Sequence, residues 1–294
     1  MSLLARLKRE IRFLRPLVRT LQRVKSIAGD SANLACDDME QAVDKFAASP
    51  AMRLESRALT YLEFDQLANR YAHWARGKGI RRGHTVAILL PNRIDYVAAW
   101  YGLSKIGVVA ALINNHLTAS ALAHCINLSV ADHIIIDDET APAFRALGPL
   151  LKHTVAAWTL GRPRGEERDL TMALRGSSSV RPDRETREGT TARDTALYIF
   201  TSGTTGLPKA ARITHMRVQL YMRGFAGATG SLPSDRIYCA LPLYHATGGL
   251  CAVGAALLNG GELVLARKFS ASQFWPDVIA SGATMFVYIG ELCR

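Results

Sequence analysis

The chain has 294 residues, of which 49% are hydrophobic and 21% are charged, and its formal net charge is +11. This composition excludes a disordered chain and is typical of a globular protein long enough for one large domain or two small ones. The five cysteines are dispersed without a C-x-x-C pair, which argues against a disulfide framework or a zinc site and favours a reducing compartment.

The N-terminal segment carries most of the net charge. Residues 1–25 contain eight Lys or Arg and one acid, whereas the remainder is nearly balanced, so a nucleic-acid-binding surface is not indicated. Apolar residues at spacings of three and four predict a basic amphipathic helix over residues 1–28, kinked or divided at Pro16. The apolar positions are Leu4, Leu7, Ile11, Leu14, Val18 and Leu21. Two interpretations stay open: residues 2–25 adsorb to an anionic membrane, or the helix docks on its own domain or on nothing.

The next part of the chain alternates between helical and strand patterns. This alternation predicts an α/β fold with a mostly parallel sheet flanked by helices. Tyr96–Ile113 is apolar, but Lys105 interrupts it, so we expect a buried helix that passes into a strand rather than a membrane span. The other predicted elements are helices over 39–48, 67–78 (ending at Gly79) and 120–129, and buried strands over 86–90 and 133–137.

Residues 161–194 break this pattern. They are rich in Gly, Arg, Glu, Ser and Thr and have little apolar periodicity. A long segment of this kind is unusual inside a compact domain unless it is functional or disordered. We therefore expect a flexible surface connection that leads into the next strand.

The stretch Y-I-F-T-S-G-T-T-G-L-P-K, Tyr198 to Lys209, is the strongest chemical signal in the chain. A buried strand runs into a loop whose glycines let main-chain N–H groups approach a ligand closely. The loop hydroxyls can donate to phosphate oxygens, and the closing lysine adds a mobile positive charge. The predicted polyphosphate cradle consists of Thr201, Ser202, Gly203, Thr204, Thr205, Gly206 and Lys209.

The residues after the loop distinguish it from a Walker A motif. G-x-x-x-x-G-K-[ST] is absent, because Ala210 follows the lysine. Ala210–Ile213 predicts a second short strand, with Thr214 as the N-cap of a helix that begins near His215. We therefore expect a strand–loop–strand unit, in which a helix dipole is not the main phosphate anchor.

Two further segments near strand ends are candidates for substrate binding. Tyr244 and His245 follow a predicted strand over 237–241, and a helix is expected over 249–258. A Tyr-His pair of this kind is also compatible with a structural hydrogen-bonding unit. Tyr288 and Gly290 end a predicted strand over 285–289, after another over 263–265, and an ordinary core strand is the alternative.

These motifs carry a family resemblance. T-S-G-T-T-G-L-P-K resembles the phosphate loop of the adenylate-forming superfamily, and L-P-L-Y-H-A-T-G-G resembles its acyl- and adenylate-site motif. A-L-T-Y-L-E-F-D-Q-L-A-N and V-A-I-L-L-P-N are similar to the opening segments of its large domain, and W-Y-G-L-S-K-I-G-V-V-A-A-L-I-N to the helix and strand that follow. V-Y-I-G-E-L-C-R looks most like the fatty acid transport protein branch, the very-long-chain acyl-CoA synthetases. The resemblance covers about residues 38–294.

The resemblance implies a partial large N-terminal domain, over residues 29–294, of an adenylate-forming enzyme. The implied reaction is ATP-dependent activation of a long- or very-long-chain fatty acid to acyl-CoA through an acyl-adenylate, with Mg²⁺ required and CoA as co-substrate. Lys209 and His245 would serve the catalytic centre, Thr201 would ligate Mg²⁺, and Tyr244, Tyr288 and Gly290 would line the substrate site. The cysteine pattern and the basic helix predict a cytoplasmic location, with peripheral contact at the inner face of the plasma membrane under the first interpretation of that helix.

The sequence also departs from the family pattern. No Y-G-x-T-E motif, ribose-binding aspartate or C-terminal catalytic lysine is found, so the resemblance predicts the N-terminal half of a synthetase. Two alternatives stay open. The chain is an inactive fragment that retains at most nucleotide or fatty-acid binding, or it derives from an aryl-CoA ligase or another adenylating enzyme.

Overall fold

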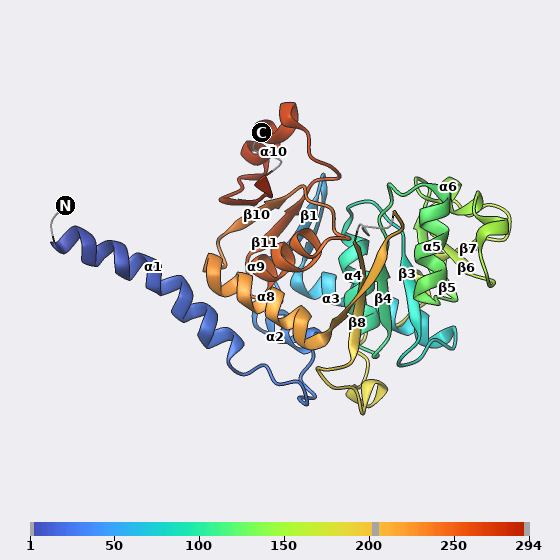
Figure 1. Ribbon diagram of the computed structural model, residues 1–294, viewed down its shortest axis with the longest axis horizontal. Coiled ribbons are helices and arrows are strands. Elements are labelled where there is room, and N and C mark those ends of the chain that lie inside the picture. Colours follow the sequence, from blue (N-terminus) through green and yellow to red (C-terminus); the bar gives the residue numbers. More distant parts are fainter. Residues whose placement is uncertain (1–2, 202–205, 291–294) are drawn as a thin grey trace.

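The computed structural model describes the backbone of residues 3–201 and 206–290, and side chains from residue 14 onward within those ranges. Two sheets lie beside each other, and helices pack between and around them (Figure 1). Sheet B has seven strands in the order β7-β6-β5-β3-β4-β8-β9, and sheet A has five in the order β12-β10-β11-β1-β2. The predicted α/β class with mostly parallel sheets is confirmed.

Only two strand pairs are antiparallel in the described sheets, β1 with β2 and β8 with β9. The strands of sheet B are β3 (Thr85–Ile88), β4 (Val109–Leu112), β5 (His133–Asp137), β6 (Ala156–Leu160), β7 (Arg168–Asp169), β8 (Thr195–Thr201) and β9 (Lys209–Thr214). Those of sheet A are β1 (Pro50–Leu54), β2 (Arg57–Thr60), β10 (Arg236–Cys239), β11 (Glu262–Leu265) and β12 (Met285–Val287). The parallel strands bring their carboxyl ends to one rim of each sheet.

The helices connect and cover these strands. They are α1 (Leu3–Val24), α2 (Ala35–Phe46), α3 (Tyr61–Gly77), α4 (Ile94–Ser104), α5 (Ala119–Ser129), α6 (Ala141–Arg145), α7 (Leu170–Arg175), α8 (His215–Thr229), α9 (Val253–Leu257) and α10 (Ala271–Ser281). As predicted for Tyr96–Ile113, α4 is buried and leads into β4. No helix of the described residues is both long and apolar enough to cross a bilayer.

One core joins the two sheets. It contains buried residues of both sheets together with α3, α4, α8 and α9. The helices α3 and α4 cross so closely that a Cβ atom on Gly102 would lie 2.1 Å from the carbonyl oxygen of Ala68. A second cluster fills the opposite face of sheet B beneath α5, and a third lies between sheet A and α10. The rim of sheet B is therefore held rigidly against that of sheet A.

The start of α3 differs from the prediction, which placed this helix at Leu67. Thr60 caps the helix instead, because its hydroxyl accepts from the backbone N–H of Glu63 at 3.2 Å. The Glu63 carboxylate accepts in return from the N–H of Thr60 at 2.8 Å. This is a capping box, and it starts the helix at Tyr61.

Residues 161–194 do not form the structureless connection that we expected. They contain β7, α7 and the 3₁₀ turn Arg184–Arg187. The side chains of Leu170 and Leu174 are buried, and Asp169 caps α7 by accepting from the N–H of Met172 at 2.8 Å. The prediction failed because arginines, rather than periodic apolar residues, bind much of this segment to the domain.

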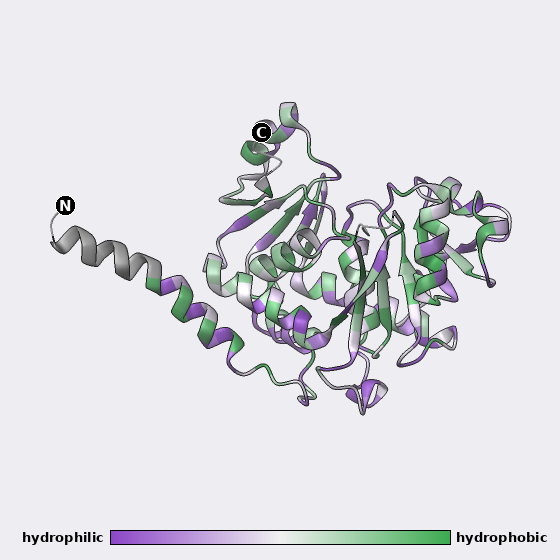
Figure 2. Cartoon of the chain, viewed as in Figure 1, coloured by the Kyte–Doolittle hydropathy of each residue, from purple (hydrophilic) through white to green (hydrophobic). Residues whose placement is uncertain are grey.

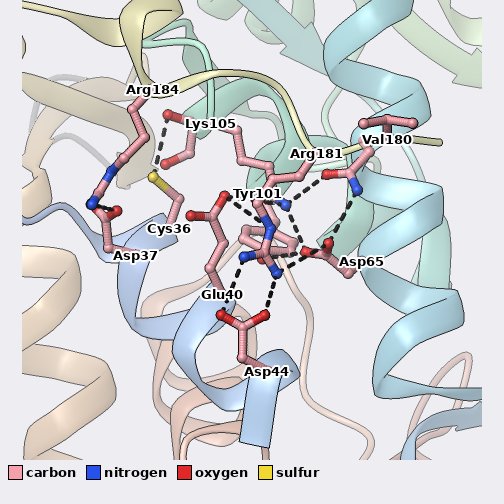
Figure 3. A network of polar contacts seen from close by, with 12 residues as sticks. Cys36, Asp37, Glu40, Asp44, Asp65, Tyr101, Lys105, Val180, Arg181 and Arg184 are labelled. Atoms are coloured by element: carbon pink, nitrogen blue, oxygen red, sulfur yellow. Dashed lines mark hydrogen bonds and ion pairs between the residues drawn. The ribbon is translucent and has the colours of Figure 1, made fainter. Parts of the chain in front are cut away.

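The arginine-rich part of this segment joins a buried polar network (Figure 3). Arg187 is 4% exposed and donates to the Asp37 carboxylate at 2.7 Å and to the carbonyl oxygen of Lys105 at 3.0 Å. The side chain of Lys105 is fully buried, and its Nζ lies 2.6 Å from Asp65 and 2.7 Å from the Asn69 amide oxygen. Arg181 reaches Asp44 at 2.8 Å. The network fixes residues 181–187, which precede β8, on α2, α3 and α4.

Helix α1 projects from the body of the chain, and its C-terminal part lies against α8 (Figure 1). It runs unbroken through Pro16, so the predicted division there is wrong. The hydroxyl of Thr20 donates to the carbonyl oxygen of Pro16 at 2.8 Å, within the same helix. Of the interpretations left open, docking of α1 on its own domain agrees with the structure for this C-terminal part.

Candidate functional site: a hydroxyl- and glycine-rich loop at the rim of the sheets

Strands β8 and β9 hold the two ends of the predicted phosphate loop side by side. Thr201 is the last residue of β8 and pairs directly with Lys209, the first residue of β9. Residues paired across antiparallel strands have Cβ atoms about 5 Å apart, so the side chains of Thr201 and Lys209 start from adjacent positions at the mouth of the loop. Both side chains are exposed. The predicted strand–loop–strand arrangement is therefore confirmed.

The loop between these ends is only partly described. Gly206 has φ +94°, a conformation that favours glycine and supports its predicted place in the turn. Ser202, Gly203, Thr204 and Thr205 lie outside the described residues, so their phosphate contacts stay a prediction. The Nε2 atom of His124, a residue of α5, lies 3.0 Å from the carbonyl oxygen of Pro208. This contact, which the sequence analysis did not anticipate, fixes the end of the loop before Lys209.

The end of β10 leads into the second predicted motif, Tyr244 and His245. Tyr244 is buried and His245 is exposed, and their ring centroids are 4.6 Å apart. Partial burial of its ring lowers the pKa of His245, and burial raises the pKa of Tyr244, so both side chains are mainly neutral at pH 7. A neutral imidazole can orient a substrate oxygen by donating or accepting a hydrogen bond.

The chain turns tightly after His245, and glycines make this turn possible. A Cβ atom on Gly249 would lie 2.1 Å from the carbonyl oxygen of Leu243, and one on Gly248 would lie 2.5 Å from that of Pro242. The turn continues as a π-helix, Thr247–Ala252, before α9 begins. π-Helical turns occur frequently at functional sites, and here the turn replaces the single helix predicted over 249–258.

Asn92 joins the rims of the two sheets, and the sequence analysis missed this role. Its side-chain amide nitrogen donates to the carbonyl oxygen of Leu241 at 2.9 Å and to that of Ala266 at 3.0 Å. Its amide oxygen accepts from the backbone N–H of Leu243 at 2.9 Å. Asn92 follows β3, whereas its partners follow β10 and β11. The available signal was a polar residue directly after a buried strand, in V-A-I-L-L-P-N.

These contacts place the two predicted motifs at one rim. The strands β3, β4 and β8 are neighbours, and Ile88, Leu112 and Ile199 are in register across them. Adjacent strands lie about 4.8 Å apart, so the ends of β3 and β8 are separated by roughly 10 Å. Asn92 attaches the segment before Tyr244 to the end of β3. The mouth of the loop and the Tyr244–His245 turn therefore lie on the same joined rim of the two sheets.

Tyr288 and Gly290 fit the prediction less well. The strand β12 ends at Val287, so both residues lie beyond the predicted strand. Tyr288 is 53% exposed, and its ring lies 5.5 Å from that of Phe286 rather than in the core. A Cβ atom on Gly290 would meet nothing within 4 Å. Their contribution to a substrate site stays a prediction.

A cavity lies elsewhere on the rim of sheet B, among the described residues. Its volume is about 810 Å³, and its lining includes Arg57, Arg93, Asp95 and Asp137 but none of the predicted site residues. Arg93 pairs with Asp137 at 2.9 Å and with Asp95 at 3.4 Å. Charges of both signs line this cavity, so it does not suit an aliphatic acyl chain.

Comparison with known proteins tests the resemblance. The model of the family described as AMP-binding enzyme matches residues 39–294. The chain belongs to the AMP-binding enzyme family. This match covers nearly all of the chain and includes the loop from Thr201 to Lys209 together with the Tyr244–His245 motif.

Two curated members of the family illustrate the relationship. Mouse long-chain fatty acid transport protein 6 is 38% identical over 244 residues, covering 82% of this chain and 39% of that protein. The medium/long-chain-fatty-acid–CoA ligase FadD6 of Mycobacterium tuberculosis is 36% identical over 245 residues, covering 83% of this chain and 40% of that protein. The chain thus spans about two fifths of the length of these relatives.

A solved structure confirms the fold of this part of the family. The Mycobacterium tuberculosis fatty acyl CoA synthetase superposes with a TM-score of 0.75 at 24% identity, covering 87% of this chain and 49% of that chain. The predicted fold is therefore confirmed over the 87% of this chain that superposes.

Proposed function

We propose that the complete polypeptide to which this chain corresponds activates long- or very-long-chain fatty acids to acyl-CoA. The fatty-acid carboxylate attacks the α-phosphorus of ATP, the bond to the bridging oxygen breaks, and pyrophosphate leaves. The thiol of CoA then attacks the acyl carbon of the adenylate, AMP leaves, and the thiol proton passes to solvent. The observation that carries this proposal is the Thr201–Lys209 pair at the mouth of the glycine-rich loop.

The residues at this rim suit the chemistry. A carboxylate is a weak nucleophile and the triphosphate repels it, so catalysis depends on positioning and on neutralising negative charge. Lys209 supplies that charge beside the β- and γ-phosphates, and the loop hydroxyls and N–H groups hold their oxygens. His245, mainly neutral at pH 7, orients the carboxylate or the α-phosphate.

Mg²⁺ fits this site as an ion held mainly by substrate. Thr201 offers one neutral oxygen at the mouth of the loop, and Mg²⁺ is commonly bound by phosphates and water with few protein ligands. When bound, the ion would draw negative charge from the phosphates. Thr201 would hold it beside Lys209.

Two alternatives make different predictions for substrate. If the chain is a binding remnant, it retains nucleotide or fatty acid without adenylation. If it derives from an aryl-CoA ligase, an aromatic acid replaces the fatty acid. Both relatives described above have names that refer to fatty acids, which favours the fatty-acid proposal.

Exchange of labelled pyrophosphate into ATP separates these possibilities. With Mg²⁺ present, we expect exchange that depends on palmitate and is absent with benzoate, because only the adenylated acid returns label to ATP. Exchange with benzoate alone would support the aryl-CoA ligase. A folded protein without any exchange would support the binding remnant.

We also propose that the enzyme works in the cytoplasm with peripheral contact to an anionic membrane through residues 2–25. The eight basic residues among the first 25 support this contact, since each cation near an anionic surface adds about 1 kcal/mol. Such a position would bring the rim of the sheets to the place where fatty acids leave the bilayer.

A further inference from the structure

Helix α1 has two different faces from residue 14 to its end. Pro16, Thr20, Arg23 and Val24 are half-buried. Leu14, Leu17, Val18 and Leu21 are 47–56% exposed. At 100° per residue, Leu14, Val18 and Leu21 fall on the side of the helix opposite to the docked residues, and Leu17 falls at the edge of that side. The arrangement is the reverse of an ordinary surface helix, which buries its apolar face.

The docked face is held by polar contacts with α8 and the turn after α9. Arg19 donates from Nε to the carbonyl oxygen of Gly227 at 3.2 Å, and Arg23 donates to the side-chain oxygen of Asn259. Arg223 of α8 donates to the hydroxyl of Ser26 at 2.9 Å. The helices touch where α8 has no side chain, because a Cβ atom on Gly227 would lie 2.6 Å from the Cα of Thr20.

The segment after α1 is fixed as well. The carbonyl oxygens of Gly29 and Ser31 accept from the N–H groups of Arg193 and Ala192, both at 2.9 Å. Ala192 and Arg193 immediately precede β8. The helix is therefore joined to the body at α8 and again beside β8.

The charges on α1 favour one kind of partner for the apolar stripe of Leu14, Leu17, Val18 and Leu21. Residues 14–25 contain four cations, Arg15, Arg19, Arg23 and Lys25, and no acid. Arg19 and Arg23 bind neutral acceptors, so their charge is not cancelled by these contacts. Apolar side chains bordered by cations match the acyl chains and headgroups of an anionic bilayer, and a surface helix of this kind inserts about 5–10 Å.

We infer that α1 is a fixed bracket, clamped to the domain by its polar face, whose outward apolar stripe inserts into an anionic phospholipid surface. This inference deepens the proposed membrane contact and rests on it. A flexible tether would leave the domain free to rotate at the membrane surface. A rigidly docked α1 instead sets the orientation of α8 and β8, and so of the rim at Thr201, relative to the membrane.

The first experiment tests the stripe by co-sedimentation with vesicles of phosphatidylcholine containing phosphatidylserine. The variant Leu14→Gln/Leu17→Gln/Val18→Gln/Leu21→Gln should lower the partition coefficient about tenfold or more, with an unchanged Tm, because these side chains face solvent. The matched control is Met172→Gln/Val180→Gln, which replaces two apolar side chains outside α1 that are 60% and 70% exposed. This control should bind vesicles like the wild type.

The outcomes separate the stripe from the membrane contact itself. If the wild type does not pellet, or pellets no more than a chain lacking residues 2–25, the membrane contact fails. A second outcome is that the wild type and the stripe variant both pellet with vesicles, whereas the chain lacking residues 2–25 does not. In that case, only the inference about the stripe fails. A lowered Tm for the stripe variant, or a dimer that it converts to monomer, would assign the stripe to a protein interface and overturn the inference.

The second experiment tests the bracket by hydrogen exchange without vesicles. We expect slow amide exchange over residues 18–24 of the wild type and faster exchange in Arg19→Lys/Arg23→Lys, which keeps the charge but loses the guanidinium contacts. Vesicle binding of this variant should stay within about twofold of the wild type. Exchange over 18–24 as fast as in an unfolded chain would show a tether and overturn the bracket.

Discussion

The substitution Lys105→Met is expected to destabilise the protein by about 3–5 kcal/mol, because removal of one partner leaves an uncompensated buried charge. The Lys105 side chain is fully buried, and its ammonium group lies 2.6 Å from Asp65 and 3.4 Å from Glu40. Burial opposes ionisation of Asp65, but Lys105 and the hydrogen bond from Tyr101 hold its pKa below the ordinary value. Without Lys105, this carboxylate loses its main partner. Urea unfolding measures the change in free energy.

Two controls accompany this measurement. Lys152→Met, at an exposed position, should change stability by less than about 0.5 kcal/mol. The double variant Lys105→Met/Asp65→Asn removes both charges and should be less destabilised than the sum of the single variants by about 1 kcal/mol or more. A Lys105→Met protein as stable as the wild type would contradict the buried pair.

The substitution Asn92→Asp is expected to cost about 3 kcal/mol, although the two side chains have nearly the same shape. The amide nitrogen of Asn92 donates to two carbonyl oxygens, of Leu241 and Ala266. A carboxylate cannot donate, so Asp would place negative charge against two acceptors in a buried site. Urea unfolding measures the loss of stability in Asn92→Asp. In a second variant, Asn92→Ala, the backbone N–H of Leu243 should exchange faster with solvent, because it loses its acceptor.

The partly exposed Asn115 provides the matched control, since Asn115→Asp should shift the unfolding free energy by no more than about 0.5 kcal/mol. Equal stability of Asn92→Asp and the wild type would show that the amide does not bridge the sheets. In that case, the attachment of the Tyr244–His245 turn to the end of β3 would need another explanation.

The sequence predicted correctly those elements that depend on residues close together in the chain, such as apolar runs and helix caps. The apolar run Tyr198–Phe200 was sufficient for β8, and Gly206 has the positive φ expected at the end of the loop. Thr214 was predicted as the N-cap of α8, and its hydroxyl does accept from the N–H of Arg217, at 3.2 Å. The capping box at Thr60 was a local signal of the same kind that we overlooked, so the predicted start of α3 was six residues late.

Contacts between distant segments were beyond the reach of these signals. Arg187 meets Asp37 across 150 positions of sequence, and nothing near Arg187 identifies that partner. Asn92 meets Leu243 across 151 positions. Similarly, the apolar periodicity of α1 predicted a helix but could not show which face docks, because the docking depends on Gly227. The ordered course of residues 161–194 and the joining of the two rims therefore required the structure.

Titration of Mg·ATP against the wild type and Lys209→Ala tests the account most directly. If the loop between β8 and β9 holds the triphosphate, the variant should bind ATP about 10- to 100-fold more weakly, the loss expected for a charged hydrogen bond. Its affinity for AMP, which lacks the β- and γ-phosphates, should be unchanged, and Lys268→Ala should bind both nucleotides like the wild type. A wild type that does not bind ATP, or equal ATP affinities for wild type and Lys209→Ala, would contradict the account.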